Sequence, residues 1–257
     1  MPGDDRRWEL AARSWTEIAA ALSPGSKVVA LLPIGSTEPH GPHLPLETDV
    51  IISAEAAVRA AGRLRERGIE AFVLPALPYT VTEYSRDFAG AIGISAATLE
   101  AALGEVAEAA LSHGFCLVCL VNSHLEPGHL EVLRRVSARL SPPGGRPVIF
   151  PDKTSRRWAA TLTDEFRSGA CHAGRYETSL VMAARPGLVD EPARRALAAN
   201  PVSIGRKIKE GARSFLEAGG DQAYFGDPAS ATAEEGRASF EALAAMVETA
   251  VLEALER

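Results

Sequence analysis

The segment that decides the fold reads Val28-Val-Ala-Leu-Leu-Pro-Ile34, and Gly35 and Ser36 close it. A continuous apolar run of this length is typical of a β-strand that is covered on both faces, as in parallel sheets. An Ala-rich segment with several arginines follows, from Thr48 or Asp49 to about Arg67. It predicts a helix, so the chain opens with a strand followed by a helix.

Strands and helices alternate along the rest of the chain. Further strands are predicted at 71–74, 115–121 and 148–150, and further helices at about 96–113, 127–140, 155–167, 177–184, 191–199 and 233–255. No internal repeat, low-complexity tract or linker interrupts this order. The pattern predicts an α/β fold with three α/β/α layers around a mostly parallel central sheet, in a single domain over residues 1–257.

Bulk composition excludes several classes of function. The 257 residues contain 27 Lys and Arg against 33 Asp and Glu, and a net charge of −6 argues against a nucleic-acid or membrane partner. The three cysteines read as buried small hydrophobes in a reducing compartment. Because no segment reads as a signal peptide or a transmembrane helix, we expect a cytoplasmic protein.

Two short motifs follow predicted strands and carry candidate metal ligands. The first runs from Glu38 through His40 to Asp49, and the second is Asn122-Ser-His124-Leu-Glu126. Side chains two residues apart in an extended segment share a face, so each motif presents an acid and an imidazole together. The carboxyl ends of parallel strands gather at one edge of the sheet, where ligands bind.

These motifs predict a site for two divalent metal ions. Its five ligands are Glu38, His40, Asp49, His124 and Glu126, with Asp49 bridging. Three carboxylates and two cations leave one positive charge, which a bridging hydroxide would neutralise. Nitrogen and oxygen ligands together favour zinc, manganese, cobalt or iron over calcium. A hydroxide activated by metal would serve as the nucleophile of a hydrolase.

Other histidines leave alternatives open. His172 lies in a loop of small residues, where it is either a general acid–base beside the metals or an ordinary loop residue. His43 either lines the site or satisfies a backbone group. His129, on the helix after Glu126, favours a structural role over metal ligation.

The motifs together resemble the creatininase (creatinine amidohydrolase) family. The resemblance rests on Leu32–Asp49, Asn122–His124, His172–Ser179 and Gly226–Gly236, which spread over most of the chain. It implies a three-layer α/β/α fold, a binuclear metal centre, hydrolysis of a non-peptide C–N bond and assembly into a homo-oligomer, commonly a hexamer. The family includes ring-opening hydrolases, deformylases and a peptide-trimming enzyme.

Carried over position by position, the resemblance assigns roles to single residues. Glu38, Asp49 and His124 would hold one metal, and His40, Asp49 and Glu126 the other. Glu126 would also act in catalysis. His172 would shuttle protons to the leaving nitrogen, and Glu177 would orient ligands or bind metal. Substrate contacts are predicted for Ser123, Leu125, His43 and Arg175.

Departures from the family pattern point to a changed substrate. His124-Leu-Glu126 resembles true creatininases, but Pro127 replaces the usual asparagine. Ser168 stands where creatininases place a tryptophan, and Ala91 replaces a hydroxyl residue. Arg175 either binds a substrate anion or forms a surface salt bridge.

We therefore expect a binuclear metal-dependent amidohydrolase acting on a cyclic amide or formamide that is not creatinine. Two alternatives stay open: an authentic creatininase, and an inactive metal-binding family member that works through assembly.

Overall fold

A computed structural model describes residues 8–256, and within them four strands form one parallel sheet in the order β2-β1-β3-β4. The strands are β1 (Val28–Ile34), β2 (Glu70–Val73), β3 (Leu117–Asn122) and β4 (Val148–Ile149). Every strand pair is parallel. The predicted sheet is confirmed, and β2 and β3 differ from their predicted limits by only one or two residues because the paired register begins at Glu70 and Leu117.

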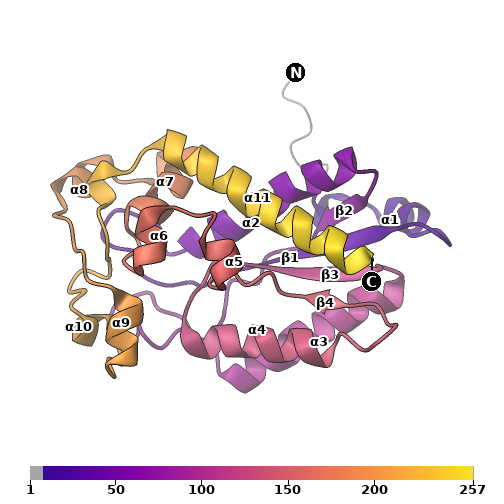
Figure 1. The fold of residues 1–257 in the computed structure, drawn as a ribbon, viewed down its shortest axis with the longest axis horizontal. Helices are drawn as coiled ribbons and strands as arrows, with labels where there is room; N and C mark the ends of the chain where they lie inside the picture. Colours follow the sequence, from indigo (N-terminus) through magenta and orange to yellow (C-terminus); the bar gives the residue numbers. More distant parts are fainter. Residues whose placement is uncertain (1–7, 257) are drawn as a thin grey trace.

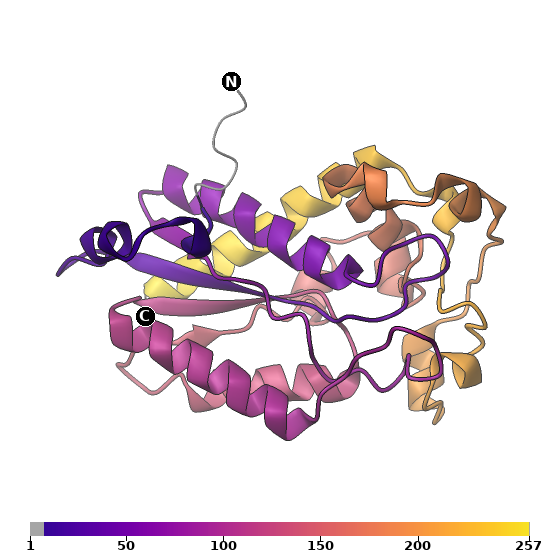
Figure 2. The ribbon, with the colours of Figure 1, turned by 180° about the vertical axis from the view of Figure 1, so that it is seen from behind.

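Helices cover both faces of this sheet (Figures 1 and 2). One layer contains α2 (Thr48–Glu66), α7 (Arg175–Ala184) and α11 (Ala233–Leu255), and the other contains α3 (Ala96–His113) and α4 (Pro127–Arg139). Val29 and Leu31 of β1 pack toward α2 and α11, whereas Ala30 and Leu32 pack toward α3 and α4. Burial on both sides explains why the strand is apolar throughout.

Local capping sets several helix limits as predicted. Ser95 Oγ accepts a hydrogen bond from the Thr98 N–H at the start of α3, and Gly114 ends this helix with a φ of 115°. Pro127 is the first residue of α4, where its missing N–H costs no helical hydrogen bond.

Other predicted helices differ in the structure. The helix expected over 155–167 is split into α5 (Arg156–Ala159) and α6 (Asp164–Ser168), because Thr163 Oγ1 accepts the Phe166 N–H and starts a new helix. Helix α7 begins two residues earlier than predicted, and α8 (Glu191–Ala196) ends earlier because Asn200 pairs with Gly226. The sequence did not predict three short helices, α1 (Trp15–Ala21), α9 (Ile204–Lys209) and α10 (Phe215–Ala218).

The topology creates a crevice between the carboxyl ends of β1 and β3. From β1 the chain crosses one face through α2, and it reaches β3 across the other face through α3. Such a change of direction is where open α/β sheets bind ligands. Ile34 and Asn122 are paired in this register, so the segments that follow them leave the sheet side by side.

Gly35 lets the end of β1 approach α2 closely. A Cβ at this position would lie 2.5 Å from the Val50 backbone nitrogen, a distance that side chains do not tolerate. The close approach brings Asp49, in the first turn of α2, to the crevice.

Among residues 8–256, no helix is both long and apolar enough to cross a membrane. Cys119 and Cys171 are buried, Cys116 is half-buried, and all three are free thiols.

Candidate metal centre

One group of buried side chains joins three of the predicted ligands. His124 Nδ1 lies 2.9 Å from Glu38 Oε1 and 3.1 Å from Asp49 Oδ2. Glu38 follows β1, Asp49 begins α2 and His124 follows β3, so the crevice brings together three distant parts of the chain. Their ligand atoms all lie within 4.8 Å of one another, which suits a single cation.

A second group shares Asp49 with the first. His40 Nε2 lies 3.5 Å from Asp49 Oδ1 and 3.6 Å from Glu177 Oε2. The three residues are at least 97% buried, and their ligand atoms again fall within 4.8 Å of each other. The two oxygens of Asp49 thus face different groups, as the predicted bridging role requires.

His40 Nε2 provides a test of whether these residues fit a metal. This nitrogen is buried without a hydrogen-bond partner, although buried polar atoms normally have one. His40 Nδ1 donates to the Glu38 backbone carbonyl at 3.0 Å, so Nε2 is the nitrogen left to bind a metal, and it points toward two carboxylates. In the metal-free protein this nitrogen carries a proton, which a bound cation would replace. A nitrogen between carboxylate oxygens is suited to a cation. The residues are therefore positioned to hold metal ions.

Glu126 is not grouped with His40 and Asp49 in the described residues, and its predicted role as a metal ligand stays a prediction. Its Oε2 accepts hydrogen bonds from the backbone N–H groups of Glu83 at 2.8 Å and Tyr84 at 3.2 Å. Those bonds turn the carboxylate toward the loop after β2, and it lies 3.9 Å from His124 Nε2. Glu177 takes its place in the second group.

The loop before α7 explains how Glu177 reaches the site. Ala173 has a left-handed backbone with a φ of 51°, and its N–H donates to Glu177 Oε2 at 2.7 Å. The helix that follows buries Tyr176 and Leu180 around Glu177. The sequence left orientation and ligation both open for Glu177, and the structure brings its carboxylate to within 3.6 Å of His40 Nε2.

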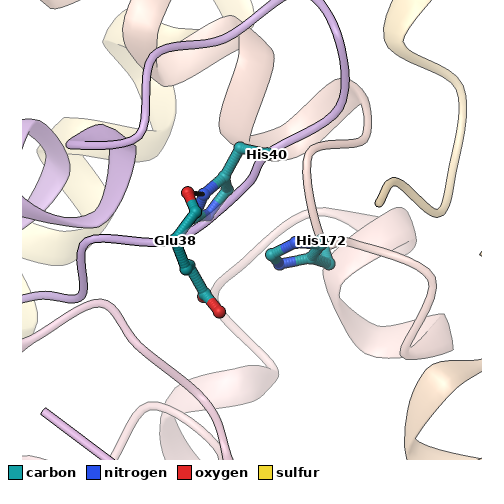
Figure 3. Close-up of side chains that lie close together, drawn as sticks. All are labelled: Glu38, His40 and His172. Carbon is teal, nitrogen blue, oxygen red and sulfur yellow. Dashed lines mark hydrogen bonds between the residues drawn. The ribbon is translucent and has the colours of Figure 1, made fainter. Parts of the chain in front are cut away.

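His172 lies beside both groups. Figure 3 shows its ring directed toward Glu38 and His40. Its ring centroid is 4.4 Å from that of His40 and 4.3 Å from that of Phe215. Nε2 donates a hydrogen bond to the Pro39 carbonyl at 3.0 Å, which leaves Nδ1 as the acceptor of the neutral ring.

Burial and neighbouring charges separate the histidines into two kinds. Burial lowers the pKa of His40, but Asp49 and Glu177 outweigh it and raise that pKa to about 10. The His124 pKa is likewise raised against burial, by Glu38 and Asp49. Burial, reinforced by the positive His40, instead lowers the pKa of His172 to about 4. His172 is thus neutral near pH 7 and can accept a proton.

The pKa values of the carboxyl groups also shift in opposite directions. Burial raises the Glu177 pKa to about 7, against the opposing effect of His40. Burial also raises the pKa of Glu126, more than His124 lowers it. The pKa of Asp49 falls well below its usual value despite burial, because His40 and His124 favour its charged form.

A cavity of about 70 Å³ opens onto these groups. The predicted substrate contacts Ser123 and Leu125 line it, and so do the predicted catalytic residues His172 and Glu126. The sequence reasoning missed five other lining residues: Tyr84, Cys171, Ile204, Ile208 and Phe215. Three of these come from the short helices α9 and α10, which carry no periodic pattern long enough to predict.

Two predicted substrate contacts lie elsewhere. Arg175 Nε lies 3.2 Å from Glu235 Oε2, so the salt-bridge alternative describes its position. His43 is fully buried, and its Nε2 is 2.8 Å from Thr178 Oγ1 behind the second ligand group. Neither residue lines the cavity. Their assignment as substrate contacts stays a prediction.

His129 supports His124 from behind, in line with the structural alternative. Its Nε2 donates to Asn122 Oδ1 at 2.8 Å, and Asn122 Nδ2 donates to the His124 carbonyl at 2.6 Å. Such outer contacts hold a ligand in its orientation.

Comparison with known proteins places these observations in a family. The family model for creatinine amidohydrolase matches residues 11–251. A mycofactocin precursor peptide peptidase of Mycobacterium tuberculosis is 31% identical over 243 residues, with 91% of this chain and 89% of that protein covered. A creatinine amidohydrolase of Pseudomonas putida is 26% identical over 192 residues, covering 69% of this chain and 72% of that protein.

Solved structures share the fold. A crystal structure of creatinine amidohydrolase superposes with a TM-score of 0.75 at 21% identity, over 96% of this chain and 97% of that one. A manganese form of creatininase gives a TM-score of 0.69 at 21% identity, over 96% and 98% of the two chains. The chain belongs to the creatinine amidohydrolase family of hydrolases and has the creatininase α/β/α fold.

Proposed function

We propose that the protein binds two divalent metal ions and hydrolyses an amide C–N bond in a substrate other than creatinine. One observation carries the proposal: the buried carboxylate of Asp49 belongs to two ligand groups at once, one through each oxygen. A shared carboxylate is how two cations are held about 3.5–4 Å apart in binuclear hydrolases.

The proposed ligands are divided between two positions. Glu38, Asp49 and His124 would hold one ion, and His40, Asp49 and Glu177 the other. Three buried carboxylates balance most of the charge of two divalent cations, and mixed nitrogen and oxygen ligands favour zinc or manganese, with iron or cobalt also compatible. When bound, such ions polarise a carbonyl and lower the pKa of water toward neutrality.

His172 is placed to move the proton that amide hydrolysis requires. Its Nε2–H is held by the Pro39 carbonyl, so Nδ1 is the atom that accepts a proton and returns it to the departing nitrogen. The lowered pKa of His172 keeps Nδ1 unprotonated before the reaction. An amine is a poor leaving group unless its nitrogen is protonated, so this transfer is part of bond cleavage.

Glu126 is proposed as a second proton carrier rather than a ligand. Two backbone amides fix its Oε2 and hold the carboxyl group at the cavity wall. Its raised pKa brings protonation closer to neutral pH, as a general acid–base needs.

The proposal of a substrate other than creatinine rests on two features. Relatives named as peptide peptidases match the chain at 31–33% identity, above the 26% of the creatinine amidohydrolase. Ser168, in place of the family's tryptophan, removes the wall that would hold a small flat ring, and Phe215 packs against His172 instead. The substrate is thus an amide of a small molecule or of a peptide.

Metal analysis and hydrolysis assays test the proposal together. We expect two ions per chain by inductively coupled plasma mass spectrometry after loading with manganese or zinc. We also expect amide hydrolysis that chelation abolishes and metal restores. Creatinine should be turned over more slowly than the best amide of a panel of lactams, formamides and short peptides. Full activity in the chelated protein would refute the proposal, and metal binding without any hydrolysis would favour the inactive alternative.

Assembly into a homo-oligomer, a hexamer on the family resemblance, stays a prediction. Size-exclusion chromatography with light scattering measures it directly.

A further inference from the structure

The lining of the cavity combines two kinds of chemistry. The ligand groups supply carboxylates and imidazoles, and the side chains of Ile204, Ile208 and Phe215 form an apolar wall. We infer that the substrate carries an aliphatic or aromatic group on the nitrogen side of the bond that is cleaved. This inference rests on the proposed function and adds the class of substrate.

The wall is built from two short helices that present apolar side chains to the cavity. Ile204 and Ile208 lie four residues apart on α9, so they share one face of the helix. Phe215 is the first residue of α10 and is 4% exposed. Tyr84 and Ile204 pack against the same cluster as Phe215. An apolar group of the substrate would continue this cluster.

Backbone hydrogen bonds attach the wall to the catalytic loops. The Phe215 N–H donates to the Tyr84 carbonyl at 2.8 Å, and the Tyr84 N–H donates to Glu126. The Ile204 N–H donates to the Gly169 carbonyl at 2.8 Å, three residues before His172. The wall is therefore held at a fixed place relative to both proposed proton carriers.

The position of His172 decides which side of the amide meets the wall. Its ring packs against both His40, a residue of the second ligand group, and Phe215, a residue of the apolar wall. Hydrolysis adds the water oxygen to the carbonyl carbon, breaks the C–N bond and puts a proton on the nitrogen, which leaves as an amine. The group that delivers this proton stands beside Phe215, so the substituent of the departing nitrogen is the part that reaches the wall.

Charge on that substituent would be disfavoured. Among the described residues that line the cavity, none is a lysine or arginine, and the carboxylates belong either to the ligand groups or to Glu126, which accepts the Tyr84 N–H. A charged group placed against isoleucine and phenylalanine would lose its hydration without gaining a partner.

Matched peptides test this specificity in the wild-type protein. N-acetyl-Gly-X-amides with X as Leu, Phe, Ser or Lys place the variable side chain on the nitrogen side, and N-acetyl-X-Gly-amides place it on the acyl side. Cleavage of the central bond is followed by liquid chromatography and mass spectrometry with the manganese-loaded protein. We expect kcat/KM to be at least about tenfold higher for Leu or Phe than for Lys on the nitrogen side, and a smaller ratio on the acyl side.

A negative charge placed on the apolar wall should create a preference for a positively charged substrate. Ile208→Asp should lower kcat/KM for the Leu peptide and raise it for the Lys peptide, because the new carboxylate supplies the missing partner. Ile92→Asp is the matched control, since Ile92 is 52% exposed and lies outside the cavity lining. It should leave both values unchanged. Thermal melting checks that each variant is folded.

The outcomes separate the inference from the proposed function. Equal cleavage of the Leu and Lys peptides, or a preference confined to the acyl side, would overturn the apolar wall while metal-dependent hydrolysis stood. Failure of the metal-loaded protein to cleave any amide in this set or in the wider panel would overturn both.

Discussion

The two ligand groups share Asp49 but are held together in different ways. In the first group, His124 hydrogen-bonds to Asp49 and lies 2.9 Å from Glu38, and Ser85 Oγ donates to Glu38 Oε2 at 2.9 Å. In the second, His40 Nε2 lies 3.5 Å or more from both carboxylates and has no hydrogen-bond partner. The first group is closed by its own contacts. The second is arranged around a cation that would complete it.

This difference predicts how much the ligands of each position rearrange when a metal binds. A preformed group needs little rearrangement to bind, whereas a group with an unsatisfied buried nitrogen gains most from an ion. We expect the first position to keep its geometry without metal. The second position should be the one whose side chains become ordered on loading.

Removing the shared carboxylate should have the largest effect. Asp49→Asn keeps the size of the side chain but removes its negative charge and replaces one of its two oxygens by an amide nitrogen, which cannot bind a cation. We expect loss of both ions and a fall in kcat of at least about 10²–10³-fold. Metal analysis and steady-state kinetics measure these effects. A variant that kept two ions would show that Asp49 is not a metal ligand.

Replacing the proton carrier should affect rate without affecting metal. His172→Gln removes the titrating Nδ1, while its amide can still donate to the Pro39 carbonyl. We expect a loss in kcat of about 10²–10⁴-fold with two ions retained. Wild-type turnover in this variant would remove His172 from the mechanism.

The open second group should make the metal-free protein sensitive to alkaline pH. The pKa of His40 is raised from 6.5 to about 10, so its protonated form stabilises the fold fully below pH 6.5, and this contribution is lost as the pH rises through 10. The melting temperature of chelated protein should therefore fall over this range. Metal-loaded protein should change less, because the cation takes the place of the proton.

His40→Gln is the control for that prediction. It lacks the titrating group, so its metal-free form should show a shallower decline than the wild type. Parallel declines in the two proteins would assign the pH dependence to other groups.

The smallest effect is expected outside the cavity. Arg175→Gln removes an ion pair with Glu235 in which the Arg175 side chain is 34% exposed. The free energy of unfolding should change by about 0–1 kcal/mol, with kcat/KM unaltered. A large rise in KM would instead indicate that Arg175 contacts the substrate.

Much of this arrangement follows from local sequence. Three local signals predicted elements that the structure confirms: the apolar run of β1, the N-cap Ser95 of α3 and Pro127 at the start of α4. Each signal depends on interactions between residues that are close in the sequence. The motif around Glu38 and His40 could be placed at the sheet edge for the same reason. These signals need no knowledge of distant contacts.

The features that could not be predicted from the sequence depend on contacts between distant parts of the chain. Glu126 and Glu177 are both acids near a histidine, but the backbone amides of Glu83 and Tyr84, far away in the sequence, hold the Glu126 carboxylate. Helices α9 and α10 are too short for periodicity, and the hydrogen bonds to Gly169 and Tyr84 hold them in place. Their contribution to the cavity emerges only when the chain is folded.

The most direct measurement compares two matched variants. Glu177→Gln and Glu126→Gln make the same chemical change at two residues that line the cavity, and metal content per chain is read by mass spectrometry after loading with manganese. The account predicts two ions in the wild type, one in Glu177→Gln and two in the slow variant Glu126→Gln. One ion in Glu126→Gln and two in Glu177→Gln would contradict it.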